Sequence, residues 1–298
     1  MAIRQDFCCL FSFLAICTAI ICCWIYPVGA NPVWAENDNH LDRNEVAFEA
    51  GEPLTDEEFN SNVQEKTASV DGSQSWEKHA HNELLGGDVV PGNNINANKN
   101  ADLKWPNAQV PYVISKSFSP DDRRIIASAM AMYHQKTCIR FVARGAQKDY
   151  VKIIRSQEST TGQKNNPGCW SVKGRAGNMQ ELSLDGTCVH RATVIHELMH
   201  ALGFDHEQQR PEQQKFITVK YENIIQERRQ WFKPNPPDAI NTIGRYDINS
   251  VMHYRANAFA IDPSKPTMVS KTGRTTMGNE NGLTTMDVEK LKKLYCNS

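Results

Sequence analysis

The sequence predicts an α+β fold with two lobes, and two observations lead to this prediction. Short apolar runs of strand length and two stretches of helical periodicity lie between Val110 and Gly203, which predicts a first lobe with a sheet and helices. The chain after Gly203 is rich in proline and has little periodicity until a final capped helix. We therefore expect a second lobe that is mostly irregular and ends in a helix.

Strands are expected where apolar and β-branched residues run between turn signals, at 110–114, 139–142, 150–154 and 180–184. A helix is expected after Ser119, because serine caps helices and Pro120 suits the first helical position. Its apolar stripe consists of Ile125, Ile126, Ala129, Met130 and Tyr133.

Two further helices are predicted. One runs from near Arg191 to Gly203. The last begins at Thr284, which is spaced from Asp287 as a capping pair, and an apolar stripe follows it.

Residues 1–30 predict a secretory signal peptide. Arg4 precedes an apolar run at 7–26, and small residues at 28–30 fit a cleavage point. The run is also long enough to cross a bilayer, so a signal anchor stays open, although the small residues favour cleavage and secretion. No second run of this kind follows, so we expect no membrane attachment after cleavage.

Charge divides the rest of the chain into two parts. Residues 31–99 carry 14 acidic and 4 basic side chains, whereas residues 100–298 carry 19 acidic and 28 basic ones. The acidic part either lies on the basic part, as a propeptide does, or is a disordered tail that touches nothing. The basic part has no run of basic and aromatic residues that would indicate nucleic-acid binding.

Five of the nine cysteines lie in the signal segment, which leaves Cys138, Cys169, Cys188 and Cys296. An even number of cysteines in a secreted chain indicates disulfides, and four allow three pairings. We favour Cys169–Cys188 with Cys138–Cys296, because the second pair ties the C-terminus to the body.

The segment VIHELMHALGFDHE, residues 194–207, carries most of the chemistry. On a helix, His196 and His200 lie about 40° apart, so both imidazoles can bind one ion. Glycine at Gly203 can end the helix in the left-handed conformation and turn His206 back toward them. Three imidazoles with one open position are typical of a catalytic Zn²⁺ site, while Glu197 can hold a water.

These residues resemble the metzincin signature, and Glu207 after the third histidine resembles the astacin family in particular. Similar family segments are found at 105–106, 110–112, 137–141, 168–171 and 250–254. The resemblance spans about Asn100 to Cys296 and implies that residues 100–298 are a metzincin-like catalytic domain, with a mixed sheet and the active-site helix in its first lobe.

The resemblance implies a role for each site residue. His196, His200 and His206 correspond to the zinc ligands, and Glu197 to the general base that takes a proton from the zinc-activated water. Tyr254 corresponds to a tyrosine that leaves zinc to stabilise the oxyanion, and Met252 to the apolar floor below the histidines. We assign structural roles to His134, His190 and His253.

Two further expectations concern activation. In the family, the mature N-terminus is buried near the residue equivalent to Glu207, and a trypsin-like cut after Lys99 would expose Asn100. Leu85-Gly86-Gly87-Asp88 resembles the propeptide motif whose aspartate binds zinc, with leucine in place of phenylalanine. A simple turn is the alternative for Asp88.

We therefore expect a secreted, monomeric zinc endopeptidase, made as a zymogen and cleaving protein or peptide substrates. The alternatives are a catalytically silent secreted binding protein with the same fold and, less favoured, another metzincin family. The intact Glu197, three histidines and Tyr254 disfavour the silent protein.

Overall fold

The computed structural model describes residues 50–61, 88–90, 104–237, 242–274 and 276–296, all within the compact unit Asn44–Ser298. The expected signal peptide, Gly86, Gly87, Lys99 and Asn100 lie outside the described residues. No helix formed by the described residues is long and apolar enough to cross a membrane.

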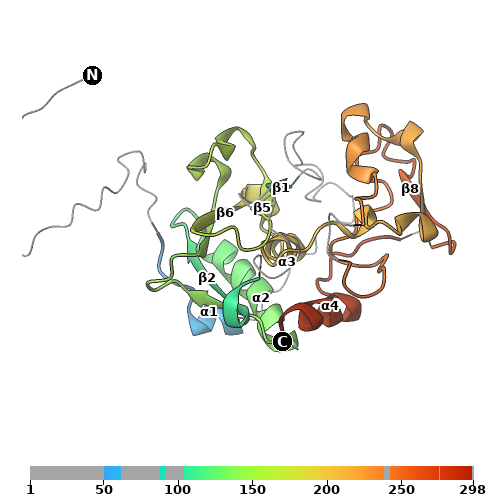
Figure 1. The fold of residues 1–298 in the computed structure, drawn as a ribbon. Coiled ribbons are helices and arrows are strands. Elements are labelled where there is room, and N and C mark those ends of the chain that lie inside the picture. The colour runs from blue at the N-terminus through green and yellow to red at the C-terminus, as the bar shows by residue number, and fades with distance from the viewer. Residues whose placement is uncertain (1–49, 62–87, 91–103, 238–241, 275, 297–298) are drawn as a thin grey trace, which may run out of the picture. The chain divides into compact units, whose positions relative to one another are not determined.

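Four α-helices are labelled in Figure 1: α1 (Asp56–Asn60), α2 (Pro120–Lys136), α3 (Arg191–Ala201) and α4 (Thr285–Tyr295). Three of them begin with a capping box, in which Thr55, Ser119 and Thr284 are the capping residues of α1, α2 and α4. The three helices expected from the sequence are confirmed, while α1 was not predicted.

The main sheet contains β1 (Val89–Val90), β2 (Gln109–Ile114), β3 (Arg140–Ala143), β4 (Tyr150–Ile154), β5 (Cys169–Val172) and β6 (Met179–Leu184). Its strand order is β1-β5-β6-β4-β2-β3. Only the β5–β6 pair is antiparallel among these neighbours, so the sheet is mixed. The four predicted strands are present with ends shifted by a residue at most, and β1 and β5 are additions.

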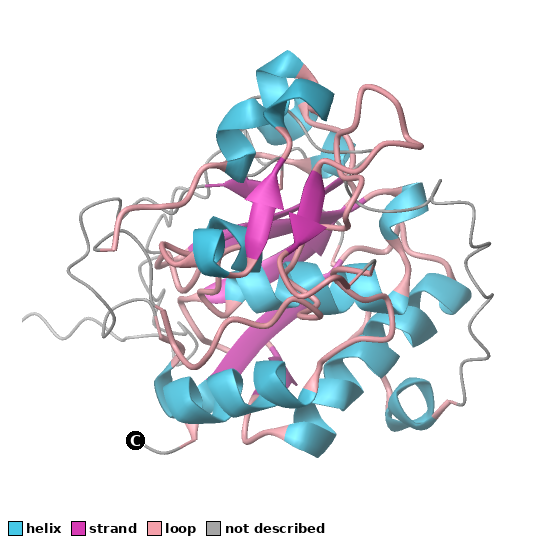
Figure 2. Cartoon of the chain, turned by 90° about the vertical axis from the view of Figure 1, so that its right-hand side faces the viewer, coloured by secondary structure: helices cyan, strands magenta, loops and turns pink. Residues whose placement is uncertain are grey.

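The chain after α3 consists largely of loops and short 3-10 turns, with one small antiparallel sheet of β7 (Ile217–Val219) and β8 (Met268–Ser270) (Figure 2). Its longest 3-10 segment is Gln226–Phe232. The α+β class with a mostly irregular second part is thus confirmed.

Two hydrophobic clusters correspond to the two lobes. The first joins the main sheet to α2 and α3, and the second surrounds Phe232 and Met268. Although α4 comes last in the chain, its Leu291 and Leu294 pack in the first cluster. Burial of these apolar faces is the main favourable contribution to folding, and it fixes α3 against the sheet.

Candidate metal centre

Helix α3 brings the first two histidines together. His196 and His200 lie one helical turn apart and are both buried. Their Nε2 atoms are 3.0 Å apart, and their ring planes are nearly perpendicular. The spacing predicted from the sequence therefore gives two nitrogens directed at one point.

The end of α3 turns the third histidine back. Gly203 has a φ of 99°, its N–H donates to the carbonyl of His200 at 2.8 Å, and Phe204 N–H donates to Met199 at 3.2 Å. This pair of hydrogen bonds is the Schellman motif that ends helices at a left-handed glycine. The turn places His206 Nε2 3.3 Å from His196 Nε2.

The hydrogen bonds of two of these histidines fix their tautomers. Nδ1 of His196 lies 2.8 Å from the Val251 carbonyl, and Nδ1 of His200 lies 2.7 Å from the Phe204 carbonyl. Because a carbonyl oxygen only accepts, each Nδ1 must carry the proton and each neutral ring exposes an Nε2 lone pair. Burial lowers the pKa of His200 to about 4, so this ring is neutral at pH 7.

Two lone pairs 3.0 Å apart repel each other unless a cation lies between them. This arrangement therefore fits a metal ion bound by Nε2 atoms, with Nδ1–H oriented by carbonyls as in other histidine sites. A set of three imidazole nitrogens favours Zn²⁺ over Ca²⁺ or Mg²⁺, which prefer oxygen ligands.

Asp88 completes the cluster. Its Oδ2 is 3.1 Å from His196 Nε2, and its Oδ1 is 3.3 Å from His206 Nε2. The ligand atoms of Asp88 and the three histidines all lie within 4.8 Å of one another. The carboxylate is fully buried.

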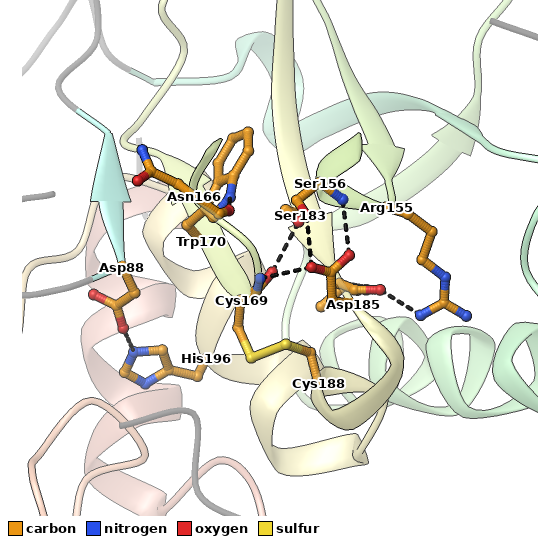
Figure 3. Close-up of a disulfide and its surroundings, with 12 residues drawn as sticks. Asp88, Arg155, Ser156, Asn166, Cys169, Trp170, Ser183, Asp185, Cys188 and His196 are labelled. Carbon is orange, nitrogen blue, oxygen red and sulfur yellow. Dashed lines mark hydrogen bonds and ion pairs between the residues drawn. A yellow bond between two sulfur atoms is a disulfide. The ribbon is translucent and has the colours of Figure 1, made fainter. Parts of the chain in front are cut away.

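Pairing with the sheet holds Asp88 in position. Its carbonyl accepts a hydrogen bond from Ser171 N–H at 2.9 Å, and the Val90 carbonyl accepts one from Lys173 N–H at 3.2 Å. Figure 3 shows Asp88 at the start of β1 with its side chain directed at His196. The strand β1 thus runs parallel to β5 at one edge of the main sheet and delivers the carboxylate.

Glu197 lies next to this cluster and is fully buried. Within the described part of the chain, neither of its carboxylate oxygens accepts a hydrogen bond. Burial, followed by the nearby charge of Asp88, raises the pKa of Glu197 well above its ordinary value. A buried carboxyl with a raised pKa is well suited to proton transfer.

The turn at Ser250–Tyr254 contacts two of the histidines, His196 and His206. The Val251 carbonyl orients His196, and the Met252 carbonyl accepts a hydrogen bond from Glu207 N–H at 2.9 Å. Met252 is buried in the first hydrophobic cluster. The ring of Tyr254 is also buried, with its centroid 4.8 Å from that of His206.

Asp287 holds this turn, a role that sequence reasoning missed. It accepts hydrogen bonds from Ser250 Oγ at 2.6 Å and Val251 N–H at 3.1 Å. The same carboxylate caps α4 through Thr284 N–H, which was the only role expected for it. The capping pair was the signal in the sequence, but it did not indicate which turn Asp287 would also bind.

Glu207 already has cationic neighbours. Lys290 Nζ lies 2.6 Å and Arg210 Nη1 3.2 Å from its Oε1, which also accepts a hydrogen bond from Asp247 N–H. Burial raises the pKa of Glu207, and the two cations oppose this effect. Because Asn100 lies outside the described residues, the proposed pairing with a mature N-terminus stays a prediction.

The other three histidines that the structure describes, His134, His190 and His253, lie outside the cluster. His253 Nε2 accepts from the Tyr246 hydroxyl at 2.7 Å, and its Nδ1–H donates to the Tyr254 carbonyl at 2.6 Å. His134 accepts a hydrogen bond from Phe141 N–H, and His190 is the N-cap residue of α3.

The described cysteines form two disulfides, Cys138–Cys296 and Cys169–Cys188. The first ties the residue after α4 to the segment before β3. The second ties β5 to the turn that precedes α3 (Figure 3). It thereby links the strand that pairs with β1 to the helix that carries His196.

Comparison with known proteins agrees with this geometry. Residues 97–296 match the peptidase family Astacin. The chain is 36% identical over 203 residues to zinc metalloproteinase nas-4 of Caenorhabditis elegans, covering 67% of this chain and 61% of that protein. It is 37% identical to nas-7 of the same organism, covering 64% of this chain and 48% of nas-7. The chain therefore spans about half to three fifths of the length of these two relatives.

High choriolytic enzyme 1 of Oryzias latipes is 34% identical over 221 residues, covering 71% of this chain and 77% of that enzyme. The solved structure of this hatching enzyme zinc-protease covers 65% of this chain and 92% of its own, with a TM-score of 0.56. The family resemblance inferred from the sequence is confirmed, and the chain belongs to the astacin family of peptidases.

Proposed function

We propose that this chain is the zymogen of a secreted zinc endopeptidase. The observation that carries the proposal is the convergence of three imidazole nitrogens on one point, with the buried Glu197 beside them. Membership of a family of zinc metalloproteinases supports it. Two disulfides are consistent with an oxidising compartment.

His196, His200 and His206 would hold the ion. When bound, Zn²⁺ supplies Lewis-acid chemistry, polarising a substrate carbonyl and lowering the pKa of water. The Val251 and Phe204 carbonyls keep the first two rings in the ligating tautomer.

Glu197 is the general base in this proposal. It removes a proton from the attacking water and later donates it to the leaving amine, which requires a carboxyl whose pKa lies near the working pH. Its burial and its lack of hydrogen-bonded partners among the described residues support this assignment. The Tyr254 hydroxyl, on a ring in contact with His206, would donate to the oxyanion.

Once β1 has left the sheet, β5 would be an edge strand and would supply backbone groups for an extended peptide substrate. Ser171 N–H and Lys173 N–H, which now donate to the Asp88 and Val90 carbonyls, would bind substrate carbonyls by strand addition. The segment around Asp88 and a substrate would therefore compete both for the metal and for this strand.

This competition would keep the chain inactive until the propeptide is removed. Residues 1–30 would be the signal peptide and 31–99 the propeptide, and 100–298 the catalytic domain released by a trypsin-like cut after Lys99. Asp88 would occupy the ligand position that the attacking water needs, a role supported by its distances to the histidines.

The test combines zinc content with peptide cleavage. Glu197→Ala should keep one zinc per chain and lose nearly all turnover, on the order of 10²–10⁴-fold or more. Asp88→Ala should give measurable activity in the unprocessed chain. Bound zinc without turnover in the processed native chain would instead favour the catalytically silent binding protein.

A further inference from the structure

Part of the acidic segment contacts β2 and α2, which do not carry the histidines of the metal centre. We call residues 50–61 the docking segment. Gly51 N–H donates to the Ile114 carbonyl at 2.7 Å, and Leu54 is buried in the first hydrophobic cluster. Leu54 N–H donates to the Tyr112 hydroxyl at 3.3 Å. The docking segment is therefore attached at the end of β2.

An ion pair attaches the docking segment to α2. Arg123 Nε lies 2.6 Å from Glu58 Oε1, and Arg123 Nη2 lies 3.1 Å from Oε2, a two-point contact. Arg123 also donates to the Pro53 carbonyl at 3.0 Å. The Thr55 capping box holds the Glu58 carboxylate in place through Thr55 N–H at 2.7 Å. Both charged side chains are about 15% exposed, so water screens the pair only in part.

An aromatic contact completes the attachment. The ring of Phe59 stacks on His134 of α2, with centroids 5.4 Å apart and an interplanar angle of 27°. His134 is itself fixed by the hydrogen bond from Phe141 N–H to its Nε2. The contacts thus combine apolar burial, backbone pairing and a two-point ion pair.

The expected cut after Lys99 lies on the C-terminal side of both the docking segment and Asp88. The docking segment and Asp88 both precede Lys99 and are joined by residues 62–87. A cut after Lys99 therefore leaves both contacts on one fragment. While the docking segment stays bound, residues 62–87 tether Asp88 to it, which raises the effective concentration of Asp88 near the metal centre.

We propose that activation takes two steps, cleavage and then dissociation of the propeptide fragment, and that the Glu58–Arg123 pair sets the rate of the second step. The docking surface around Tyr112, Arg123 and His134 is thus a second propeptide-binding site. This inference rests on the proposed latency by Asp88. A second cut within 62–87, which contains Lys66 and Lys78, would separate the two contacts and speed release.

The experiment uses the full proenzyme with the recognition sequence of a site-specific protease inserted between Lys99 and Asn100. Size-exclusion chromatography at intervals after cleavage measures how much fragment stays bound, and peptide cleavage is followed in parallel. In the native chain we expect activity to follow fragment release rather than cleavage. Glu58→Gln should speed release on the order of tenfold, since it removes a charge-assisted two-point contact.

Glu57→Gln is the matched control, because Glu57 lies on the same helix, is exposed and has no ion-pair partner among the described residues. Its release rate should equal that of the native chain. Arg123→Glu should match or exceed the effect of Glu58→Gln, and Glu58→Arg combined with Arg123→Glu should restore slow release.

The proposal would be overturned if the native chain released the fragment as fast as it was cleaved and if Glu58→Gln and Glu57→Gln had the same release rate. Chromatography separates this failure from failure of the proposed function, because retention does not depend on turnover. If Glu58→Gln speeds release but the unprocessed Asp88→Ala chain stays inactive, the docking site stands and latency by Asp88 is wrong.

Discussion

Lys290 Nζ lies 2.6 Å from Glu207 Oε1, and both side chains are at least nine-tenths buried. The pair joins α4 to the residue that follows the third histidine, although the two are far apart in the sequence. Arg210 and the backbone N–H of Asp247 bind the same oxygen. The negative charge of Glu207 is therefore balanced by two cations of the same chain.

Lys290→Met should destabilise the full chain by about 3–5 kcal/mol, because it leaves Glu207 buried with only Arg210 to balance its charge. Urea unfolding of the zinc-loaded full chain measures the loss, with Lys290→Arg as the control that keeps the charge. If the proposed mature N-terminus also reaches Glu207, the processed form should lose less stability than the full chain. Equal losses in the two forms would count against that pairing.

Gly203→Ala should weaken zinc binding as well as folding. A residue with a Cβ at a φ of 99° is strained by about 1–2 kcal/mol, and relief of that strain would move His206. Competition with a chelator measures the zinc dissociation constant, and we expect it to rise about tenfold. Gly186→Ala is the control, since a Cβ there meets no atom within 4 Å. An unchanged constant in Gly203→Ala would show that the turn does not position His206.

The two disulfides should differ in their contribution to stability. Cys138 and Cys296 are separated by 158 residues, whereas Cys169 and Cys188 are separated by 19. The chain-entropy relation gives about 5 kcal/mol for the longer loop and about 3 kcal/mol for the shorter one. Thermal unfolding of the two paired alanine variants tests this order. A larger loss from removing the Cys169–Cys188 bond would indicate that its tie between β5 and α3 outweighs loop entropy.

The stability of the full chain should fall as the pH decreases from about 6.5 to 4, in part through His134. Burial, aided by the charge of Arg140, lowers the pKa of His134 to about 4. The unfolded chain therefore binds more protons than the folded chain in this range, so acid favours unfolding. Protonation of Nε2 would also remove the acceptor for Phe141 N–H.

His134→Gln removes the titration and keeps a hydrogen-bond acceptor, so its unfolding free energy should depend less steeply on pH between about 4 and 6.5. Parallel curves for the native chain and His134→Gln would exclude His134 as a contributor.

The sequence by itself determined the features that depend on short-range geometry. His196, Gly203 and His206 lie within a few residues of one another, so helical periodicity and the left-handed glycine decide their arrangement. The same holds for the starts of α2 and α4, because a capping box needs only residues spaced three apart. The four strands predicted from apolar runs are also local patterns.

Only the tertiary structure decided which distant groups meet. The Val251 carbonyl that fixes the tautomer of His196, the contact of Lys290 with Glu207, and the bond from Asp287 to the Ser250 hydroxyl all join residues that no local pattern relates. The same is true of the ion pair between Glu58 and Arg123, since the sequence left open whether the acidic segment touches the body. Such contacts depend on how helices and strands pack around a shared core, and a capping or periodicity signal carries no information about that packing.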